Sequence, residues 1–306
     1  MVRKARLAET GAGLNPTRTR RIRLTWLDAA LLGLLAALLA LVAWRVQAVL
    51  NYRWNWAPIP NFLVRWDADR GWVANLLVQG LLNTIRLAVW GMLLAAVIGT
   101  AVALLRNATL LLPRLAGGAF VEVMRNTPPL VLIFVGYFFV SSQIMPLLGI
   151  DALVRDAGPV MRETLAALFG EPRVLKNFLS AVIVLGLFEG AYVAEILRAG
   201  IASVERGQHD AAAALGLRPW QAMRRVVLPQ AVGRMVPPLC GQFISLVKDS
   251  SIVSLISVQD LTFMSNEVAV STTRVFETWI TASALYFILC LGLSVLFRRW
   301  ERRFRQ

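Results

Sequence analysis

The sequence has few charged residues, one histidine and two cysteines in a length of 306 residues. Charged residues make up 16% of the chain and hydrophobic residues 57%, whereas soluble domains average about 25% charged residues. The mean hydropathy of +0.61 is correspondingly high. This composition excludes an ordinary soluble globular protein and favours a membrane protein.

The shortage of chemically reactive side chains also narrows the function. His209 is the only histidine, and Cys240 and Cys290 lie in apolar stretches without the spacing of a metal site or a disulfide framework. We find no Ser/His/Asp or Cys/His set and no G-x-x-x-x-G-K-S/T phosphate loop. A membrane-anchored enzyme therefore has little support, and any ATP hydrolysis must belong to another chain. We expect no catalytic residue, metal or cofactor in this chain.

The sequence instead contains six long apolar stretches, each near the roughly 20 residues that a helix needs to cross a bilayer. They span residues 29–49, 76–105, 115–140, 177–201, 231–256 and 278–296. The first exceeds the h-region of a secretory signal peptide, which has about 7–15 residues, so we expect a retained helix. The sequence predicts an all-α integral membrane protein with six transmembrane helices.

The net charge of +14 follows from membrane topology in this interpretation, and we expect no nucleic-acid partner. Six spans place both termini on the same side of the membrane. The two termini and the loops 106–114 and 198–234 hold 20 of the 32 Lys and Arg residues, whereas the segments on the other side hold 8. Because Lys and Arg concentrate in cytoplasmic loops, we predict that both termini are cytoplasmic.

A polar stretch at residues 203–230, called the 203–230 loop below, interrupts the apolar pattern of the second half. Residues 211–214 are alanines, which favour helix, and Gly216 is placed to end that helix because glycine accepts the left-handed conformation there. Pro219 suits the first turn of a second helix, and we expect Pro229 to end it. Paired helix signals favour a docking surface, although a solvated linker is the usual role of a polar loop.

Four charged residues within the predicted spans form two pairs at helical spacing. A charge within the membrane costs about 2.5–3.5 kcal/mol, so such residues usually face the protein interior or a pathway. Glu122 and Arg125, like Glu195 and Arg198, are three residues apart and can share one helix face. A structural ion pair near the cytoplasmic interface, where long side chains reach water, is the alternative to a place in a pathway.

The stretch around Lys248 and Asp249 lacks such a pair. Adjacent residues do not share a helix face, so each of the two needs another partner. Ser250 and further hydroxyl residues follow them, and Pro237 and Pro238 precede them. This composition predicts a broken helix that lines a cavity.

Glu189 lies about half-way along its span and has no basic residue three or four positions later. An unpaired carboxyl group in the membrane is either neutral or faces a polar cavity. Glu189 is therefore a candidate contact for a cationic group such as an α-ammonium. The alternative is an ion pair across the bundle with Arg86 or Lys248.

Residues 207–212 read Gly-Gln-His-Asp-Ala-Ala, and Gly216 and a Leu-Pro-Gln-Ala sequence at 228–231 follow them. This pattern resembles the cytoplasmic EAA loop of bacterial ABC importer permease subunits, in the polar amino-acid branch of histidine, glutamine and glutamate systems. Asp210 stands where that loop usually has Glu, so its carboxylate reaches one methylene less far. Further motifs extend the resemblance over about residues 76–300; they lie at 80–84, 121–130, 191–201 and 247–251.

The resemblance implies a fold and a set of partners. The fold is the five-helix core of a type I ABC importer, to which residues 29–49 add an N-terminal helix. The implied protein partners are ABC ATPase subunits, a second permease (as a homodimer or a sibling heterodimer) and a periplasmic amino-acid-binding protein. The ATPase subunits would bind the ATP, and membrane lipid would surround the spans.

Two groups of functional residues follow from these patterns. By resemblance, the 203–230 loop couples to the ATPase through Gly207, Gln208, Asp210, Ala211, Ala212, Gly216, Leu217 and Pro229. From the polar residues within the spans, we predict a substrate pathway that includes Glu122, Arg125, Glu189, Glu195, Lys248, Asp249 and Ser250.

The chain divides into five predicted parts. A Trp-rich segment follows the first span, and its amphipathic rings suit the headgroup level of the membrane. The parts are a basic cytoplasmic N-terminus (1–26), an N-terminal transmembrane helix (27–50), a Trp-rich periplasmic segment (51–75), the ABC transporter permease domain (76–300) and a basic tail (301–306).

We expect a multi-pass permease of the bacterial inner membrane that carries polar amino acids into the cytoplasm and is driven by separate ATPase subunits. The alternative is a secondary amino-acid transporter driven by an ion gradient, which the intramembrane acids Glu189 and Glu195 favour. Many such transporters contain internal repeats, but the two halves of this chain show none. An ion-driven transporter would also leave the 203–230 loop without a role.

Overall fold

The computed structural model describes residues 25–50, 52–69 and 71–304. The chain divides into two compact units, Met1–Trp54 and Asn55–Gln306. The first unit contains helix α1 (Trp26–Leu50), whose apolar part covers Trp26–Val42. The helix is present as predicted, but its use as a sixth span and the cytoplasmic location of both termini remain predictions.

Helices dominate the second unit, apart from one two-stranded hairpin. In chain order its elements are α2 (Ile59–Leu63), β1 (Val64–Asp67), β2 (Gly71–Ala74), α3 (Leu76–Arg106), α4 (Leu111–Asn126), α5 (Pro129–Phe139), η1 (Val140–Ile144), α6 (Met145–Leu147), α7 (Ile150–Asp156), α8 (Pro159–Phe169), η2 (Pro172–Val174), α9 (Leu175–Ala202), α10 (Arg206–Ala214), α11 (Pro219–Ala222), η3 (Met223–Val227), α12 (Leu228–Asp249), η4 (Ser250–Ile256), α13 (Leu261–Thr272) and α14 (Val275–Phe304). The segments η1 and η3 are π-helical, and η2 and η4 are 3₁₀-helical.

Five helical stretches of the described chain are long and apolar enough to cross a membrane. They are Leu76–Arg106, Pro129–Leu147, Pro172–Ala202, Pro219–Ile256 and Val275–Glu301. The prediction of an all-α membrane protein with a five-helix core is confirmed.

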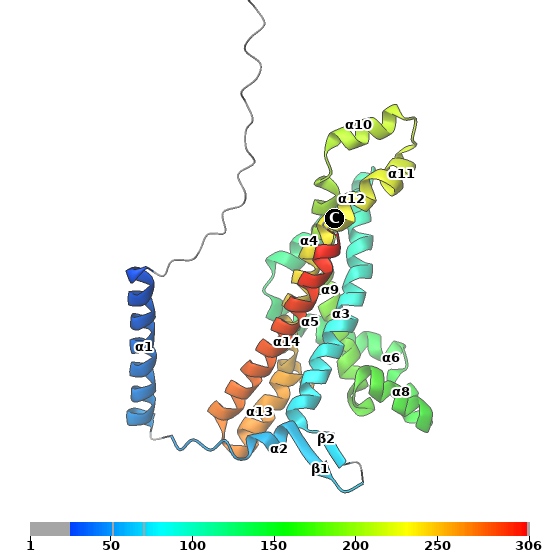
Figure 1. The fold of residues 1–306 in the computed structure, drawn as a ribbon. Coiled ribbons are helices and arrows are strands. Elements are labelled where there is room, and N and C mark those ends of the chain that lie inside the picture. The colour runs from blue at the N-terminus through cyan, green and yellow to red at the C-terminus, as the bar shows by residue number, and fades with distance from the viewer. Residues whose placement is uncertain (1–24, 51, 70, 305–306) are drawn as a thin grey trace, which may run out of the picture. The chain divides into compact units, whose positions relative to one another are not determined.

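The hairpin and the 203–230 loop lie at opposite ends of the helical bundle (Figure 1). The antiparallel strands β1 and β2 place Trp66 opposite Trp72. The two indole rings pack edge to face, with their centroids 5.5 Å apart. Asn75 caps the following helix, α3, because its side chain accepts a hydrogen bond from the Leu76 N–H. The hairpin therefore leads directly into a membrane span.

The sequence predicted the third span at residues 115–140, and the structure places it elsewhere. Helix α4 ends at Asn126, because Thr127 precedes Pro128 and takes an extended conformation with φ −98° and ψ 138°. A residue before proline is disfavoured in the helical region. The apolar span starts only at Pro129 and runs to Leu147. Glu122 and Arg125 consequently lie on α4, before the span and outside it.

The predicted breaks at Pro229 and at Pro237–Pro238 are also wrong. The π-helical turn η3 pairs the Leu228 N–H with the Met223 carbonyl, and Pro229 then occupies the first turn of α12, where a missing N–H is tolerated. Pro237 and Pro238 lie inside α12. The α-helix ends at Asp249 and the 3₁₀-helical segment η4 begins at Ser250, so a change of helix type does lie in the predicted stretch around Lys248 and Asp249.

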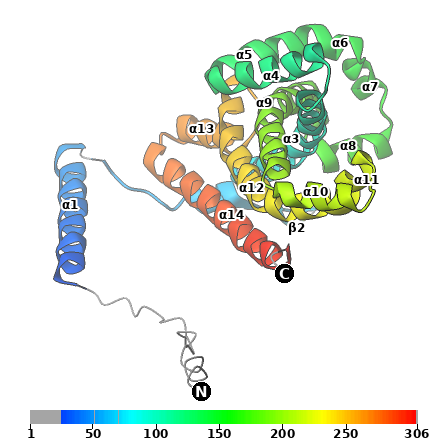
Figure 2. The same ribbon diagram turned by 90° about the horizontal axis from the view of Figure 1, so that it is seen from above.

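Helices α3 and α9 pack against each other through glycines at the centre of the bundle (Figure 2). A Cβ atom on Gly99 would lie 2.6 Å from Val193 Cγ1, and one on Gly190 would lie 2.8 Å from Ile98 Cγ2. Gly186 precedes Gly190 by four residues, the small-xxx-small spacing that allows close approach of transmembrane helices. The seam therefore has no room for additional side-chain atoms.

The largest buried apolar cluster lies against this seam. It joins α3, α5, α9, α12 and η4 through the side chains of Leu87, Ile133, Leu185, Leu246 and Val253. All five side chains are fully buried. The central pair of helices and three neighbouring elements thus form one packed body.

Replacement of Gly190 by valine should destabilise this body, because the new side chain would overlap Ile98 across the seam. Overpacking of this kind costs about 1–3 kcal/mol. Unfolding of the purified protein in detergent, followed by circular dichroism, measures the change in the free energy of unfolding. Gly118→Val is the control, since a Cβ atom on Gly118 of α4 would meet no atom within 4 Å. Equal stability of the two variants would contradict the proposed seam.

Candidate functional site

The 203–230 loop projects beyond the helical bundle and forms two short helices, α10 and α11 (Figure 1). At the end of α10 the Gly216 N–H donates to the Ala213 carbonyl (2.9 Å), and the Leu217 N–H donates to the Ala212 carbonyl (3.1 Å). Gly216 has a φ of +74°. This pair of hydrogen bonds and the left-handed glycine define a Schellman C-cap. The predicted end of the first helix is confirmed.

The second helix of the loop also begins as predicted. Pro219 lies in the first turn of α11, where it loses no intrahelical hydrogen bond. The side chain of Gln221 folds back, and its Oε1 accepts a hydrogen bond from the Arg218 N–H at 3.0 Å. Hydrogen bonds to the backbone therefore fix both ends of the connection, at the C-cap of α10 and at the start of α11.

Most of the predicted ATPase-coupling residues are exposed. Gly207, Gln208, Asp210, Ala211 and Gly216 are exposed, Leu217 is half-buried, and Ala212 is only 2% exposed. Pro229 is exposed but lies in α12, at the base of the loop. The structure therefore places all of these residues except Pro229 on the projecting part of the loop.

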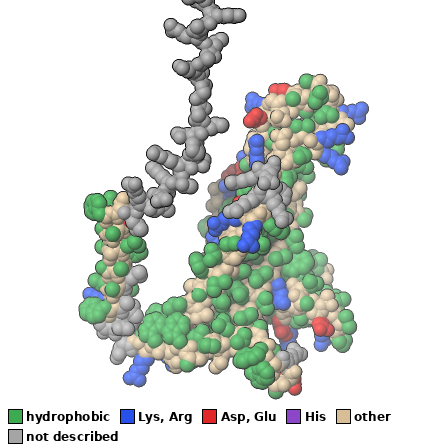
Figure 3. Space-filling model, viewed as in Figure 1, with side chains coloured by type: hydrophobic (Ala, Val, Ile, Leu, Met, Phe, Trp, Pro, Cys, Tyr) green, Lys and Arg blue, Asp and Glu red, His purple; other side chains and the backbone are tan. Residues whose placement is uncertain are grey.

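Two large apolar side chains in the loop escaped the sequence analysis. Leu215 is 81% exposed and Trp220 is 71% exposed, although neither belongs to the membrane-facing bundle. Arg218, Arg224 and Arg225 nearby in sequence are also exposed, and Figure 3 shows basic side chains around hydrophobic ones at this end of the molecule. Exposed apolar side chains within a polar rim mark protein contact surfaces. The signal in the sequence was a Leu and a Trp beside the turn residues of a polar loop.

Glu195 forms ion pairs with two arginines at the same end of the bundle. Arg198 of the same helix and Arg106 of α3 both donate to its carboxylate. The predicted pair of Glu195 and Arg198 is confirmed, and Arg106 is an additional partner from another helix. This arrangement supports a structural role, since it ties the end of α3 to α9.

The predicted pair of Glu122 and Arg125 is wrong. Glu122 Oε2 instead accepts a hydrogen bond from Asn126 Nδ2 at 2.6 Å, one helical turn later. The Arg125 guanidinium lies over the ring of Tyr192 in α9, 5.5 Å from its centroid. A cation–π contact to a neighbouring helix thus replaces the expected contact within α4.

Glu189 is fully buried in the middle of α9. Its Oε2 accepts a hydrogen bond from Gln242 Nε2 of α12 at 2.6 Å. Its Oε1 has no hydrogen-bond partner within the described part of the chain. Neither Arg86 nor Lys248 pairs with it, because Arg86 donates to the Asn83 side chain and Lys248 is exposed. A buried polar atom without a partner is costly, so this carboxyl group is available to a ligand or a proton.

Asp249 adds a second carboxyl group on the α12 side. It follows Gln242 by two helical turns and is half-buried. Ser250 is buried, and its hydroxyl donates to the Val247 carbonyl at 2.9 Å. The structure thus brings Glu189 and Gln242 together between α9 and α12. Glu122, Arg125 and Glu195 lie apart from them, toward the 203–230 loop.

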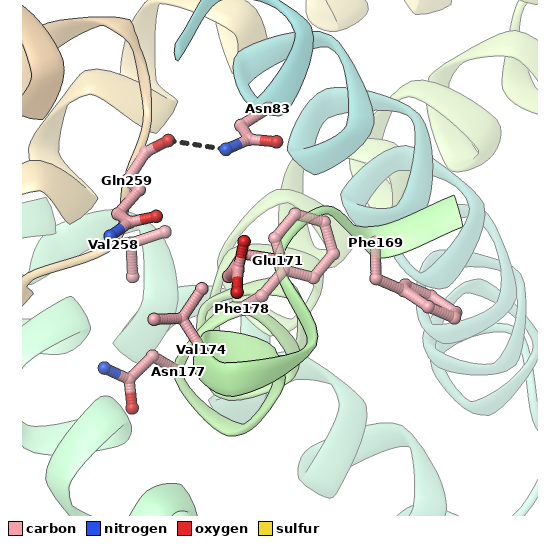
Figure 4. A pocket seen from close by; sticks show the side chains of 8 residues that line it. All are labelled: Asn83, Phe169, Glu171, Val174, Asn177, Phe178, Val258 and Gln259. Atoms are coloured by element: carbon pink, nitrogen blue, oxygen red, sulfur yellow. Dashed lines mark hydrogen bonds between the residues drawn. The ribbon is translucent and has the colours of Figure 1, made fainter. Parts of the chain in front are cut away.

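A small polar pocket lies toward the other end of the bundle, among α3, the α8–α9 connection and the η4–α13 connection (Figure 4). Asn83 Nδ2 donates there to the Gln259 carbonyl at 2.9 Å. The lining residues are Asn83, Phe169, Glu171, Val174, Asn177, Phe178, Val258 and Gln259. Its volume of about 10 Å³ holds roughly one water molecule. The pocket is too small for an amino acid in this conformation.

Side chains of α3 fix the elements around this pocket. Arg86 donates to the Ala167 carbonyl at 3.2 Å, and Trp90 donates to the Leu168 carbonyl at 3.1 Å. These are carbonyls at the end of α8, where intrahelical partners are lacking. The contacts explain how an arginine within a span is satisfied without an acid, and they hold α8 against α3.

Asp260 closes the same end of the structure between α13 and α14. Its Oδ1 accepts a hydrogen bond from the Phe263 N–H at 2.9 Å and caps α13, and its Oδ2 accepts one from the Tyr286 hydroxyl at 3.1 Å. Burial raises the pKa of Asp260 to about 6, although these hydrogen bonds oppose the shift. The residue is thus a buried structural cap.

Comparison with known proteins agrees with this architecture. The family model described as "Binding-protein-dependent transport system inner membrane component" matches residues 95–306. The chain is 32% identical over 243 residues to the glutamine transport system permease protein GlnP of Escherichia coli (strain K12), covering 79% of this chain and 99% of that protein. It is 30% identical over 227 residues to the glutamate/aspartate import permease protein GltK of Escherichia coli O157:H7, covering 74% and 92%.

A solved structure gives the same result for the fold. The crystal structure of an amino acid ABC transporter with histidines superposes with a TM-score of 0.60 at 32% sequence identity, over 74% of this chain and 94% of that one. Since the family model matches more than half of the chain and five helices can span the membrane, the chain belongs to the family of binding-protein-dependent transport system inner membrane components, as a multi-pass permease subunit.

Proposed function

We propose that this permease carries polar amino acids into the cytoplasm and is driven by ATP that separate ATPase subunits bind and hydrolyse. The observation that carries the proposal is the 203–230 loop, a projecting element with exposed Leu215 and Trp220. Such side chains supply the buried centre of a protein interface. A chain without a phosphate loop needs this contact, because its energy source must dock from outside.

The substrate class rests on the relatives and on the membrane site. Proteins similar to this chain are named for glutamine and for glutamate/aspartate transport, and all of these substrates carry an α-ammonium and an α-carboxylate. The carboxyl group of Glu189 lies between α9 and α12, where Gln242 binds its Oε2, and its Oε1 has no partner in the described residues. We assign the α-ammonium of the substrate to the carboxyl group of Glu189.

The proposed assembly contains further chains on both sides of the membrane. Two ATPase subunits bind the 203–230 loops of two permeases, which are either two copies of this chain or this chain and a sibling. A periplasmic amino-acid-binding protein delivers the substrate at the opposite end of the bundle. No nucleic acid takes part. Asp210, exposed on α10, is available to the ATPase surface.

An ion-driven secondary transporter remains the second candidate, on the strength of one observation. A buried carboxyl group with a free oxygen, such as Glu189, is typical of proton relays in membrane proteins. That mechanism gives no role to the exposed apolar side chains of the 203–230 loop.

Uptake should depend on ATP and should not depend on an ion gradient. The permease is reconstituted in vesicles with a candidate ATPase and an amino-acid-binding protein, and the uptake of labelled glutamine, glutamate and histidine is measured. We expect uptake with ATP that persists after an ionophore has collapsed ion gradients. Uptake that needs the gradient but not ATP would establish the secondary transporter instead.

Gly216→Leu should uncouple ATP hydrolysis from uptake, because a leucine strains the backbone at a φ of +74°. The strain is of the order of 1 kcal/mol and should disturb the junction between α10 and α11. Gly216→Asn is the matched control, since asparagine tolerates the left-handed conformation better than other residues. The ratio of amino acid imported to ATP hydrolysed should fall in the leucine variant and largely recover in the asparagine variant. Similar ratios in both would contradict the role of the C-cap.

Glu189→Gln should weaken the binding of substrate within the membrane without loss of the complex. A hydrogen bond to a charged group contributes about 1.5–3 kcal/mol, so we expect the apparent KM for uptake to rise roughly tenfold or more. Glu163→Gln, at an exposed position on α8, is the control. An unchanged KM in the Glu189 variant would remove this residue from the substrate pathway.

A further inference from the structure

Arg234 of α12 joins two helices at the point where the 203–230 loop begins. Its guanidinium donates to the carbonyl of Ser203, the residue that caps the C-terminal end of α9. The same nitrogen, Nη1, lies 3.3 Å from the Ser203 hydroxyl, and that hydroxyl donates to the Gly200 carbonyl at 2.7 Å. Helix α10 starts three residues after Ser203. Arg234 therefore holds the last turn of α9 directly below the loop.

Apolar packing reinforces this junction on one side. Val204, Val227, Ala231 and Met235 form a buried cluster between the end of α9 and the start of α12. A Cβ atom on Gly200 would overlap the Met235 side chain. The two helices therefore pack closely at Gly200, where an added side chain would displace the flexible side chain of Met235.

The other side of the junction is open. A groove of about 330 Å³ lies between α9 and α12, and its lining includes Glu195, Ser203, Arg234 and Pro238. Arg234 and Ser203 bridge the two helices at this groove. On this side, hydrogen bonds between Arg234 and Ser203 connect the two helices, whereas packed apolar side chains connect them on the other side.

A second polar contact links α12 to the first helix of the loop. Gln230 Nε2 donates to Gln208 Oε1 of α10 at 3.1 Å. Helix α10 otherwise packs mainly against α11 and η3, its neighbours in the loop. A displacement of α10 can therefore reach the bundle through α12 and the end of α9.

The same helix α12 reaches the buried acid in the membrane. Gln242, about two turns after Arg234, donates to Glu189. One continuous helix thus contacts the base of the loop at Arg234 and the candidate substrate site at Gln242. Pro237 and Pro238 lie between these two points and remove backbone hydrogen bonds there, which makes this part of α12 easier to bend.

We propose that Arg234 is the positioning residue that transmits a displacement of the 203–230 loop to α12, and through Gln242 to Glu189. This inference rests on the proposed function, in which an ATPase moves the loop. Arg234 touches neither ATP nor the substrate. Its removal leaves the exposed face of the loop intact but separates the movement of the loop from that of the membrane site.

The first test measures the junction itself in the assembled complex of permease, ATPase and binding protein. Amide hydrogen exchange at residues 204–214 is compared between the wild type, Arg234→Ala and Arg114→Ala. Arg114 is an exposed arginine of α4 whose side chain forms no hydrogen bond within the described residues. We expect exchange to rise about tenfold in the Arg234 variant, as the loss of a charged hydrogen bond implies, and not in the control. Unchanged exchange overturns the proposal.

The second test measures coupling in vesicles. We expect Arg234→Ala to retain the bound ATPase and its rate of hydrolysis, while amino acid imported per ATP hydrolysed falls about fivefold or more. Arg234→Lys keeps one charged donor and should restore part of the ratio. An unchanged ratio, or loss of the ATPase from both variants, shows that Arg234 is only a structural cap and overturns the proposal.

The wild-type control separates this outcome from a failure of the proposed function. Wild-type uptake that does not require ATP refutes the ATP-driven permease, and the transmission role of Arg234 falls with it. ATP-dependent wild-type uptake with an unaltered ratio in Arg234→Ala refutes the role of Arg234 alone.

Discussion

The close approach of α3 and α9 is the constraint on which the other features depend. Gly99 in α3 and Gly190 in α9 leave no space for a side chain at the seam, so the two helices keep one register along their length. That register aligns Arg106 with Glu195 near the 203–230 loop. In lipid there is little hydrophobic driving force between helices, and close packing takes its place. The shape of this seam therefore determines where the charges at its end meet.

The seam also determines the direction in which Glu189 points. Gly186 and Gly190 flank Glu189 in sequence and face α3, whereas Glu189 meets Gln242 on α12. Because successive residues of a helix are about 100° apart, a face committed to α3 presents its neighbour to a third helix. The packing of Gly186 and Gly190 against α3 thus orients the side chain of Glu189 toward α12. A change in the packing of α9 against α3 would therefore also change the position of Glu189 relative to Gln242.

The features that the sequence predicted correctly depend on local rules. The Gly216 C-cap, the Pro219 helix start and the pair of Glu195 and Arg198 each require only a few neighbouring residues. The predicted bounds of the third span were wrong because the extended conformation of Thr127 before Pro128 separates α4 from α5. Apolar composition alone does not reveal that break. Partners from other helices could not be read from spacing either: Arg125 contacts Tyr192, and Glu189 contacts Gln242.

The two glutamates of α9 differ in how far the described residues satisfy their carboxyl groups. Glu195 is offset by Arg106 and Arg198, so a new cation would only exchange one partner for another. Glu189 lies less than two turns earlier, and its Oε1 has no partner among the described residues. Gln242 binds only Oε2, and a buried charged oxygen without a partner is unfavourable, so a cation near Oε1 would stabilise the charged carboxylate. Glu195 thus ties α9 to α3 beside the loop, whereas our proposal assigns Glu189, at the centre of the same helix, to the binding of the substrate.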